Sequence, residues 1–274
     1  MIPVGFDYAR PDSVDAALAL IAEHGEDATI LAGGHSLLPV MKLRLAAPEL
    51  VIDIGRLTEL NYIRVDGDDV AIGAGSRHRE VEVSEVLATE VPLLPAVART
   101  VGDPQVRHRG TIGGSLAHAD PASDLPAAVL ALNGMVVLRS PRGERSVPIT
   151  QFYTGVFSTV KEPDELIVEI RVPRAGAQLS QGWAFEKFTR RANDWAIVGV
   201  AVVDGRVGLV NMGSTPLRAS ATEAALADGA SIEDAAALAD QATDPPADTA
   251  ATPQYRRHLA KVLTRRALQT ASGG

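Results

Sequence analysis

Two glycine pairs, each followed closely by a hydroxyl residue, are the parts of this 274-residue sequence best suited to bind an anion. The first lies in Ala32-Gly33-Gly34-His35-Ser36, after a short apolar segment, and the second in Thr111-Ile112-Gly113-Gly114-Ser115. Paired glycines let the backbone adopt positive φ and turn successive N–H groups toward one point, where they bind phosphate oxygens. Two such loops predict a ligand with linked phosphates. The alternative is that each pair only forms a tight turn.

Other well-known nucleotide motifs are missing. The segment 72–78 begins like a dinucleotide-binding fingerprint, but His78 stands where the third glycine is required. No Gly-Lys-Ser/Thr sequence occurs, which excludes a P-loop. The six histidines form no pair at helical spacing, so the sequence predicts no metal site.

The composition narrows the range of functions further. Without cysteine, the chain can hold no thiolate-ligated iron–sulfur cluster, catalytic thiol or disulfide. A net charge of −8 without a basic stripe argues against a nucleic-acid partner. Because no apolar run approaches the roughly 18 residues of a transmembrane segment and no signal peptide is recognisable, we expect a cytoplasmic protein.

Hydrophobic periodicity predicts a mixed α and β chain that places these loops after strands. A first helix begins at a cap on Asp12 or Ser13 and ends at Gly25. The predicted strands are Thr29–Leu31, Leu50–Ile54, Val70–Gly73, Met135–Leu138, Glu165–Val172, Trp183–Phe188, Ala196–Val203 and Val207–Met212. Further helices are predicted from Pro92, near Asp124, at 219–228 and 232–241, and over 255–268. A glycine-rich loop at 110–115 and a linker at 173–182 complete the pattern.

The two glycine-pair segments and their neighbours resemble the motifs of a known family. The segments 32–44 and 110–124 resemble the two FAD signatures of the flavoprotein subunits of molybdenum hydroxylases, above all those of the carbon monoxide dehydrogenase type, and 213–219 and 255–260 fit the same subunits. The resemblance implies an α+β fold: a two-subdomain FAD-binding domain of the vanillyl-alcohol-oxidase/PCMH type over 1–174, divided near 57, and a small α+β domain of the carbon monoxide dehydrogenase flavoprotein C-terminal type over 178–274.

The resemblance also implies roles for individual residues. The segments Ala32–Ser36 and Thr111–Ser115 would hold the FAD pyrophosphate. Asp124 would contact hydroxyls of the cofactor, with a helix N-cap as the alternative, and Lys187 would lie near the flavin, with an exposed strand lysine as the alternative. The remaining implied cofactor-binding residues are Leu37, Val101, His118, Asp120 and Leu166. No catalytic residue and no metal ligand are implied.

The implied function is electron transfer by an oxidoreductase subunit with non-covalent FAD. A large subunit would carry the molybdenum cofactor and a small one the [2Fe–2S] clusters, in a dimer of heterotrimers. The resemblance leaves open whether the protein also contacts a membrane surface through its electron acceptor. The complex would oxidise carbon monoxide or, alternatively, an N-heterocycle such as nicotine, caffeine or xanthine. Two alternatives belong to other classes of protein. One is a stand-alone flavin oxidase, and the other is a non-enzymatic assembly protein.

Overall fold

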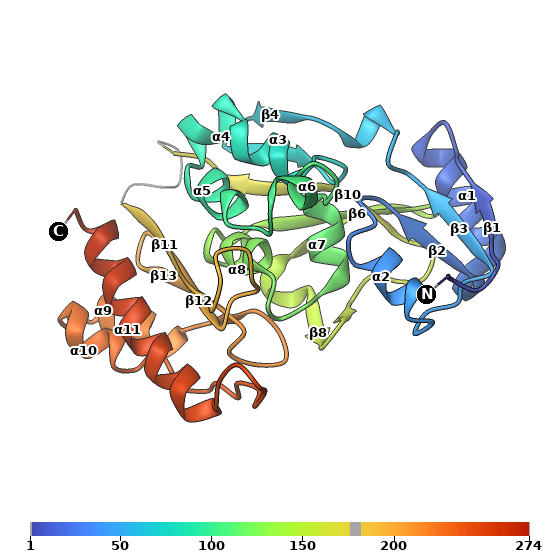
Figure 1. Cartoon of the computed structure of the whole chain (residues 1–274). Helices are drawn as coiled ribbons and strands as arrows, with labels where there is room; N and C mark the ends of the chain where they lie inside the picture. The colour runs from blue at the N-terminus through green and yellow to red at the C-terminus, as the bar shows by residue number, and fades with distance from the viewer. Residues whose placement is uncertain (1, 176–181, 274) are drawn as a thin grey trace.

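The computed structural model describes residues 2–175 and 182–273, in which three main β-sheets are packed with helices (Figure 1). The first sheet is parallel, with β3 (Leu50–Asp53) between β1 (Asp7–Ala9) and β2 (Ala28–Leu31). Helix α1 (Val14–His24) buries Val14, Ala17, Leu18 and Ile21. Its N-cap is Ser13, whose hydroxyl accepts from the amide of Ala16, and its C-cap is Gly25, as predicted.

Helix α2 (Leu37–Lys42) follows β2 at the first glycine pair. The sequence did not predict this helix. Three short 3₁₀ turns lie at Gly25–Asp27, Thr58–Leu60 and Ile149–Gln151.

The second sheet is antiparallel, in the order β4-β5-β10-β6-β7. Its strands are Ile63–Asp66, Asp69–Gly73, Leu166–Pro173, Met135–Ser140 and Gly143–Pro148. Between β5 and β6 the chain forms helices α3 to α8: His78–Val83, Glu85–Glu90, Leu93–Arg99, Pro104–Arg107, Ile112–His118 and Asp124–Ala131. A hairpin, β8 (Tyr153–Gly155) and β9 (Ser158–Thr159), lies between β7 and β10.

The third sheet is antiparallel and runs β11-β12-β13-β14, over Trp183–Phe188, Val198–Val203, Arg206–Val210 and Leu217–Arg218. Helices α9 (Ser220–Ala227), α10 (Ile232–Ala236) and α11 (Pro253–Ala271) complete this part, and α11 packs on β11 and β12. The predicted second Ala-rich helix is therefore shorter than expected and the last one longer. Most of the predicted linker, residues 176–181, lies outside the described residues.

Helix α8 joins the second and third sheets. Each of its residues is buried, because one side contributes to the core of the second sheet and the other packs on β12 and β13. Gly208 permits this contact: a Cβ there would lie 2.3 Å from the carbonyl oxygen of Ala127. Asp124, the first residue of α8, is thereby fixed between two packed layers.

No helix within the described ranges is both long and apolar enough to cross a membrane.

Candidate functional site

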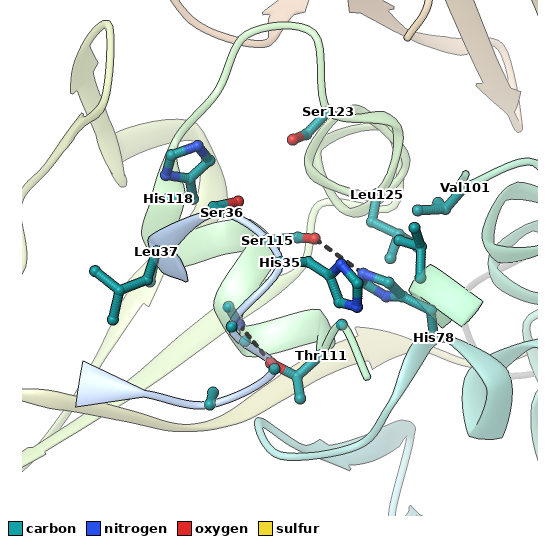
Figure 2. A pocket seen from close by; sticks show the side chains of 18 of the residues that line it. His35, Ser36, Leu37, His78, Val101, Thr111, Ser115, His118, Ser123 and Leu125 are labelled. Atoms are coloured by element: carbon teal, nitrogen blue, oxygen red, sulfur yellow. Dashed lines mark hydrogen bonds between the residues drawn. The ribbon is translucent and has the colours of Figure 1, made fainter. Parts of the chain in front are cut away.

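A cavity of about 610 Å³ opens between the three sheets, and most of the residues implied by the family resemblance line it (Figure 2). Its walls come from the loop between β2 and α2, helix α7, the first turn of α8, the start of β10, and β11 with the loop that follows. The implied residues that line it are Ala32, Gly33, Gly34, His35, Ser36, Leu37, Val101, Thr111, Gly113, Gly114, Ser115, His118, Asp124, Leu166 and Lys187.

The loop from Gly33 to Leu37 presents a row of free backbone donors. None of the five amides in this loop donates to an acceptor anywhere in 2–175 or 182–273. Gly34 has a φ of +77°, the region that favours glycine. Gly33 is needed for a different reason, because a Cβ there would lie 2.3 Å from the carbonyl oxygen of Arg109. Consecutive free amides in such a turn are suited to bind anionic oxygens. Anion binding at this loop stays a prediction.

The second glycine pair is not a loop, which corrects the prediction for 110–115. Thr111 is the N-cap of α7, and Gly113 and Gly114 lie in its first turn without positive φ. The four amides that follow Thr111 are all bonded inside the protein: Ile112 to Ser76 O at 3.0 Å, Gly113 to Ala74 O at 3.0 Å, Gly114 to Thr111 Oγ1 at 3.1 Å and Ser115 to Thr111 O at 3.0 Å. This segment therefore offers hydroxyl groups to the cavity rather than a row of amides.

Close packing explains both glycines of this segment. A Cβ on Gly113 would lie 2.6 Å from the carbonyl oxygen of Ala74, and one on Gly114 would lie 2.7 Å from Thr111 Oγ1. A side chain at Gly114 would therefore disturb the cap of α7 before it reached a ligand.

A buried ion pair closes another part of the cavity. Lys187 Nζ lies 2.6 Å from Asp124 Oδ2 and also donates to the carbonyl oxygen of Thr100 at 3.0 Å. The other carboxylate oxygen, Asp124 Oδ1, is buried without a hydrogen-bond partner among the described residues. Burial raises the pKa of Asp124 to about 6, although the Lys187 ammonium opposes this effect. A ligand hydroxyl that donated to Oδ1 would satisfy this oxygen.

Both simpler alternatives for these two residues are wrong. Asp124 is not the N-cap of α8, because Ser123 occupies that position and Asp124 lies one residue inside the helix. Lys187 is not an exposed strand lysine, since only 8% of its side chain is accessible.

Two predicted residues lie away from the cavity lining. The side chain of Ile112 is buried in the core of the second sheet. Asp120 accepts a hydrogen bond from the amide of Ala122 at 2.9 Å and so stabilises the turn before α8. His118 does line the cavity, with its ring centroid 5.0 Å from that of Phe157, and burial lowers its pKa.

His78 is a cavity residue that the sequence did not identify. The bridge between Arg77 and Thr111 brings it beside α7, where its Nε2 lies 3.4 Å from Ser115 Oγ. In Figure 2 its ring lies next to that of His35. Burial is the main reason why the pKa of His78 is lowered to about 4, so the ring is neutral at physiological pH.

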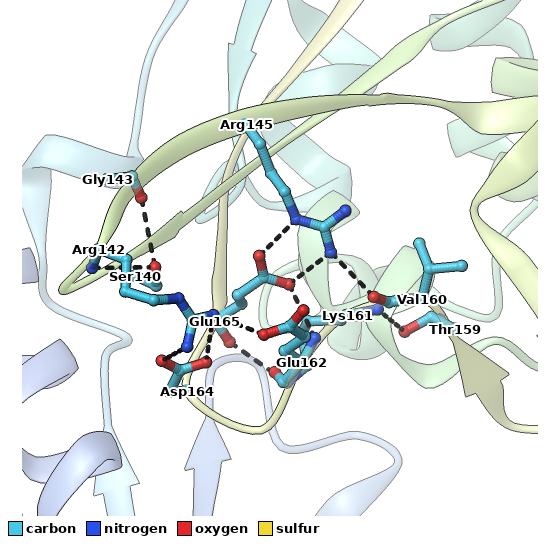
Figure 3. A network of polar contacts seen from close by, with 10 residues as sticks. All are labelled: Ser140, Arg142, Gly143, Arg145, Thr159, Val160, Lys161, Glu162, Asp164 and Glu165. Carbon is cyan, nitrogen blue, oxygen red and sulfur yellow. Dashed lines mark hydrogen bonds and ion pairs between the residues drawn. The ribbon is translucent and has the colours of Figure 1, made fainter.

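Lys161 and Glu165, just before β10, also line the cavity without having been predicted. Figure 3 shows the polar network to which they belong. Arg145 holds the carboxylate of Glu165 through two bonds of 2.6 and 2.8 Å. Lys161 Nζ donates to the carbonyl oxygens of Glu162 and Glu165. No local pattern in the sequence indicates this network, because Arg145 lies on β7 whereas Lys161 and Glu165 lie between β9 and β10.

Comparison with known proteins agrees with this geometry. Residues 4–175 match the model of the FAD binding domain in molybdopterin dehydrogenase, and residues 183–271 match that of the CO dehydrogenase flavoprotein C-terminal domain. The chain belongs to this family of FAD-binding subunits. The predicted family, fold class and oxidoreductase-subunit function are therefore confirmed, and the family's cofactor is FAD.

Members of the family resemble the chain over its full length. It is 43% identical to the carbon monoxide dehydrogenase medium chain of Hydrogenophaga pseudoflava, over 99% of this chain and 98% of that one. The caffeine dehydrogenase subunit beta of Pseudomonas sp. (strain CBB1) is 37% identical over 99% of this chain and 96% of its own length. The solved structure of the Hydrogenophaga carbon monoxide dehydrogenase superposes with a TM-score of 0.95, covering 100% of this chain and 99% of that one, at 43% identity.

Proposed function

We propose that this chain holds one FAD non-covalently in the cavity and passes electrons from an iron–sulfur partner to an external acceptor. The free amides of Gly33–Leu37 are the observation that carries the proposal. They form one wall of a cavity whose other walls supply hydroxyls and a buried carboxylate oxygen without a described partner. A dinucleotide needs this combination, because it presents both phosphates and sugar-type hydroxyls. Family membership supports the same ligand.

Each part of the cavity has a role toward this ligand. The amides of 33–37 would bind the pyrophosphate, and the hydroxyls of Thr111 and Ser115 would add donors from α7. Asp124 Oδ1 would accept from a hydroxyl of the ligand, and Lys187 would keep the carboxylate ionised. When bound, FAD supplies one- and two-electron chemistry, so the chain needs to bind, orient and shield the cofactor but requires no acid–base residue.

The apolar part of the wall would receive the ring system. Val101, Leu166 and Trp195 also line the cavity, and such side chains pack against a planar aromatic group. We propose these roles for the cavity-lining residues alone, and we also propose a FAD-binding domain over residues 1–174 and a C-terminal domain over residues 178–274.

We further propose that the whole complex oxidises carbon monoxide. The support is the identity of 43% with the Hydrogenophaga medium chain, against 37% for the caffeine dehydrogenase subunit. Oxidation of an N-heterocycle is the second candidate. The proposed partners are a molybdenum subunit and a [2Fe–2S] subunit, arranged as a dimer of heterotrimers in the cytoplasm.

The test is to purify the tagged chain together with the proposed molybdenum and iron–sulfur subunits. We expect a flavin absorbance spectrum, about one FAD per chain released by denaturation without proteolysis, and reduction of the flavin by carbon monoxide. Reduction by an N-heterocycle instead would favour the second candidate. A complex without flavin that cannot be reconstituted with FAD would refute the proposal, and substrate turnover by the chain alone would indicate a stand-alone oxidase.

A further inference from the structure

The wall of the cavity contains one buried histidine that the proposed function leaves without a role. His78 is the first residue of α3, and only 4% of it is exposed. Its amide donates to the carbonyl oxygen of Gly110 at 2.9 Å. Gly110 also permits the close approach of the ring, because a Cβ at this glycine would lie 2.7 Å from His78 Cδ2. The imidazole is therefore held at a fixed place beside the start of α7.

At this place His78 adjoins both segments that would hold the pyrophosphate. On the side of α7, Ser115 Oγ lies 3.4 Å from His78 Nε2. On the side of the loop between β2 and α2, the ring of His35 lies next to that of His78 (Figure 2). The Ser115 hydroxyl lines the cavity and makes no other hydrogen bond within 2–175 and 182–273, so it can still form a bond to a ligand.

The position of the imidazole proton decides which kind of bond that hydroxyl can form. Burial is the main reason why the pKa of His78 is lowered to about 4, so at physiological pH the neutral ring carries a single N–H. Nδ1 is buried and has no hydrogen-bond partner among the described residues. A proton on Nδ1 would therefore be a buried donor without an acceptor, which is rare in proteins. The proton belongs on Nε2, where Ser115 Oγ can accept it.

The direction of this hydrogen bond fixes the direction of the next one. A serine hydroxyl has one proton to donate and two lone pairs that accept. When Oγ accepts from Nε2–H, its own proton is free to point into the cavity, and the bond that it accepts makes it a stronger donor. If Oγ donated to Nε2 instead, Ser115 could offer a ligand only lone pairs. Because phosphate oxygens are acceptors, only the first arrangement suits an anionic ligand.

We propose that His78 is a positioning residue for the pyrophosphate: its Nε2–H donates to Ser115 Oγ and thereby directs the Ser115 hydroxyl proton toward a phosphate oxygen in the cavity. The inference rests on the proposed function, because it requires the pyrophosphate to lie beside α7. His78 acts through Ser115 and makes no contact with the phosphate itself.

The test is a double-mutant cycle between His78 and Ser115, measured as the affinity of the deflavinated complex for FAD. His78→Phe keeps a ring but removes both nitrogens, and Ser115→Ala removes the hydroxyl. We expect Ser115→Ala to weaken FAD binding by about ten- to hundredfold, since it removes a bond to a charged group, and His78→Phe to weaken it by about three- to tenfold. In the Ser115→Ala background, His78→Phe should change the affinity by less than about twofold, because its partner is already absent.

Two amide variants of His78 provide a matched comparison. His78→Gln places an amide N–H within reach of Ser115 Oγ, whereas His78→Asn carries the same amide on a side chain one methylene shorter. We expect His78→Gln to stay within about twofold of the wild-type affinity and His78→Asn to bind FAD as weakly as His78→Phe. Thermal unfolding checks that each variant is folded, and the amide pair decides the question if His78→Phe does not fold.

An equal loss from His78→Phe in the wild-type and Ser115→Ala backgrounds would show that the ring only fills space, and would overturn the inference. So would an unchanged affinity in His78→Phe or in Ser115→Ala, or equal affinities of His78→Gln and His78→Asn. A wild-type complex that binds no FAD at all would overturn the proposed function itself, and is thereby distinguished from a wrong role for His78.

Discussion

Affinity for FAD should rise with pH because of Asp124. Burial raises the pKa of this carboxyl to about 6, and its Oδ1 has no partner among the described residues. A ligand hydroxyl that donates to Oδ1 stabilises the ionised form and not the protonated one. Binding should therefore strengthen as pH rises through about 6. Because this pKa lies near 6, most Asp124 carboxyls are protonated at pH 5, so the dissociation constant should be about tenfold larger at pH 5 than at pH 8.

The substitution Asp124→Asn gives the matching result. It removes a hydrogen bond to a charged group, worth about 1.5–3 kcal/mol, so FAD should bind roughly ten- to hundredfold more weakly at pH 8. The slope between pH 5 and pH 8 should also disappear. Asp120→Asn is the control, because this nearby carboxylate caps a turn and does not line the cavity. The assay is quenching of FAD fluorescence on titration into the deflavinated complex. A wild-type affinity that is flat or falls with pH, or an unchanged slope in Asp124→Asn, would refute this reasoning.

Three further variants test the positioning of the site. Gly33→Ala places a Cβ 2.3 Å from Arg109 O, so we expect loss of FAD from the purified complex, whereas Gly5→Ala, with nothing within 4 Å, should keep it. Lys187→Met leaves the buried Asp124 without its cation, which should lower the free energy of unfolding by about 3–5 kcal/mol in denaturant titrations; a change below 1 kcal/mol would contradict a strong pair. Gly208→Ala forces α8 away from β13, so the melting temperature and FAD affinity should fall together, and an unaltered affinity would show that α8 need not be fixed by this contact.

Short sequence patterns predict the parts of the site whose conformation depends only on neighbouring residues, and the two glycine pairs show where such patterns succeed and fail. The glycine pair at Gly33 and Gly34 follows a strand, as its sequence predicts, and its amides have no acceptor in the part of the chain that the structure describes. The pair at Gly113 and Gly114 looks the same in sequence, but both amides already donate inside the protein. The amide of Gly114 donates to the cap of α7 at Thr111, and that of Gly113 donates to the carbonyl oxygen of Ala74, which is distant in the chain. No short-range pattern could separate the two cases.

Long-range contacts explain the remaining differences. His78 enters the cavity only because Arg77 pairs with Thr111. Lys187 is buried because β11 packs beside α5 and the Lys187 side chain reaches Asp124 at the start of α8. Helix α8 is buried on every side and has no amphipathic pattern, and its start was found through Pro126 in the first turn. Family resemblance supplied Asp124 and Lys187 as a cofactor pair, whereas their direct contact required the fold.

The most direct test of the account is a structure of the FAD-loaded complex at a resolution that places phosphate oxygens. We predict pyrophosphate oxygens within hydrogen-bonding distance of the amides of Gly33–Leu37, and a ligand hydroxyl that donates to Asp124 Oδ1. Phosphates bound instead to the amides of Ile112–Ser115, or a flavin outside this cavity, would contradict it.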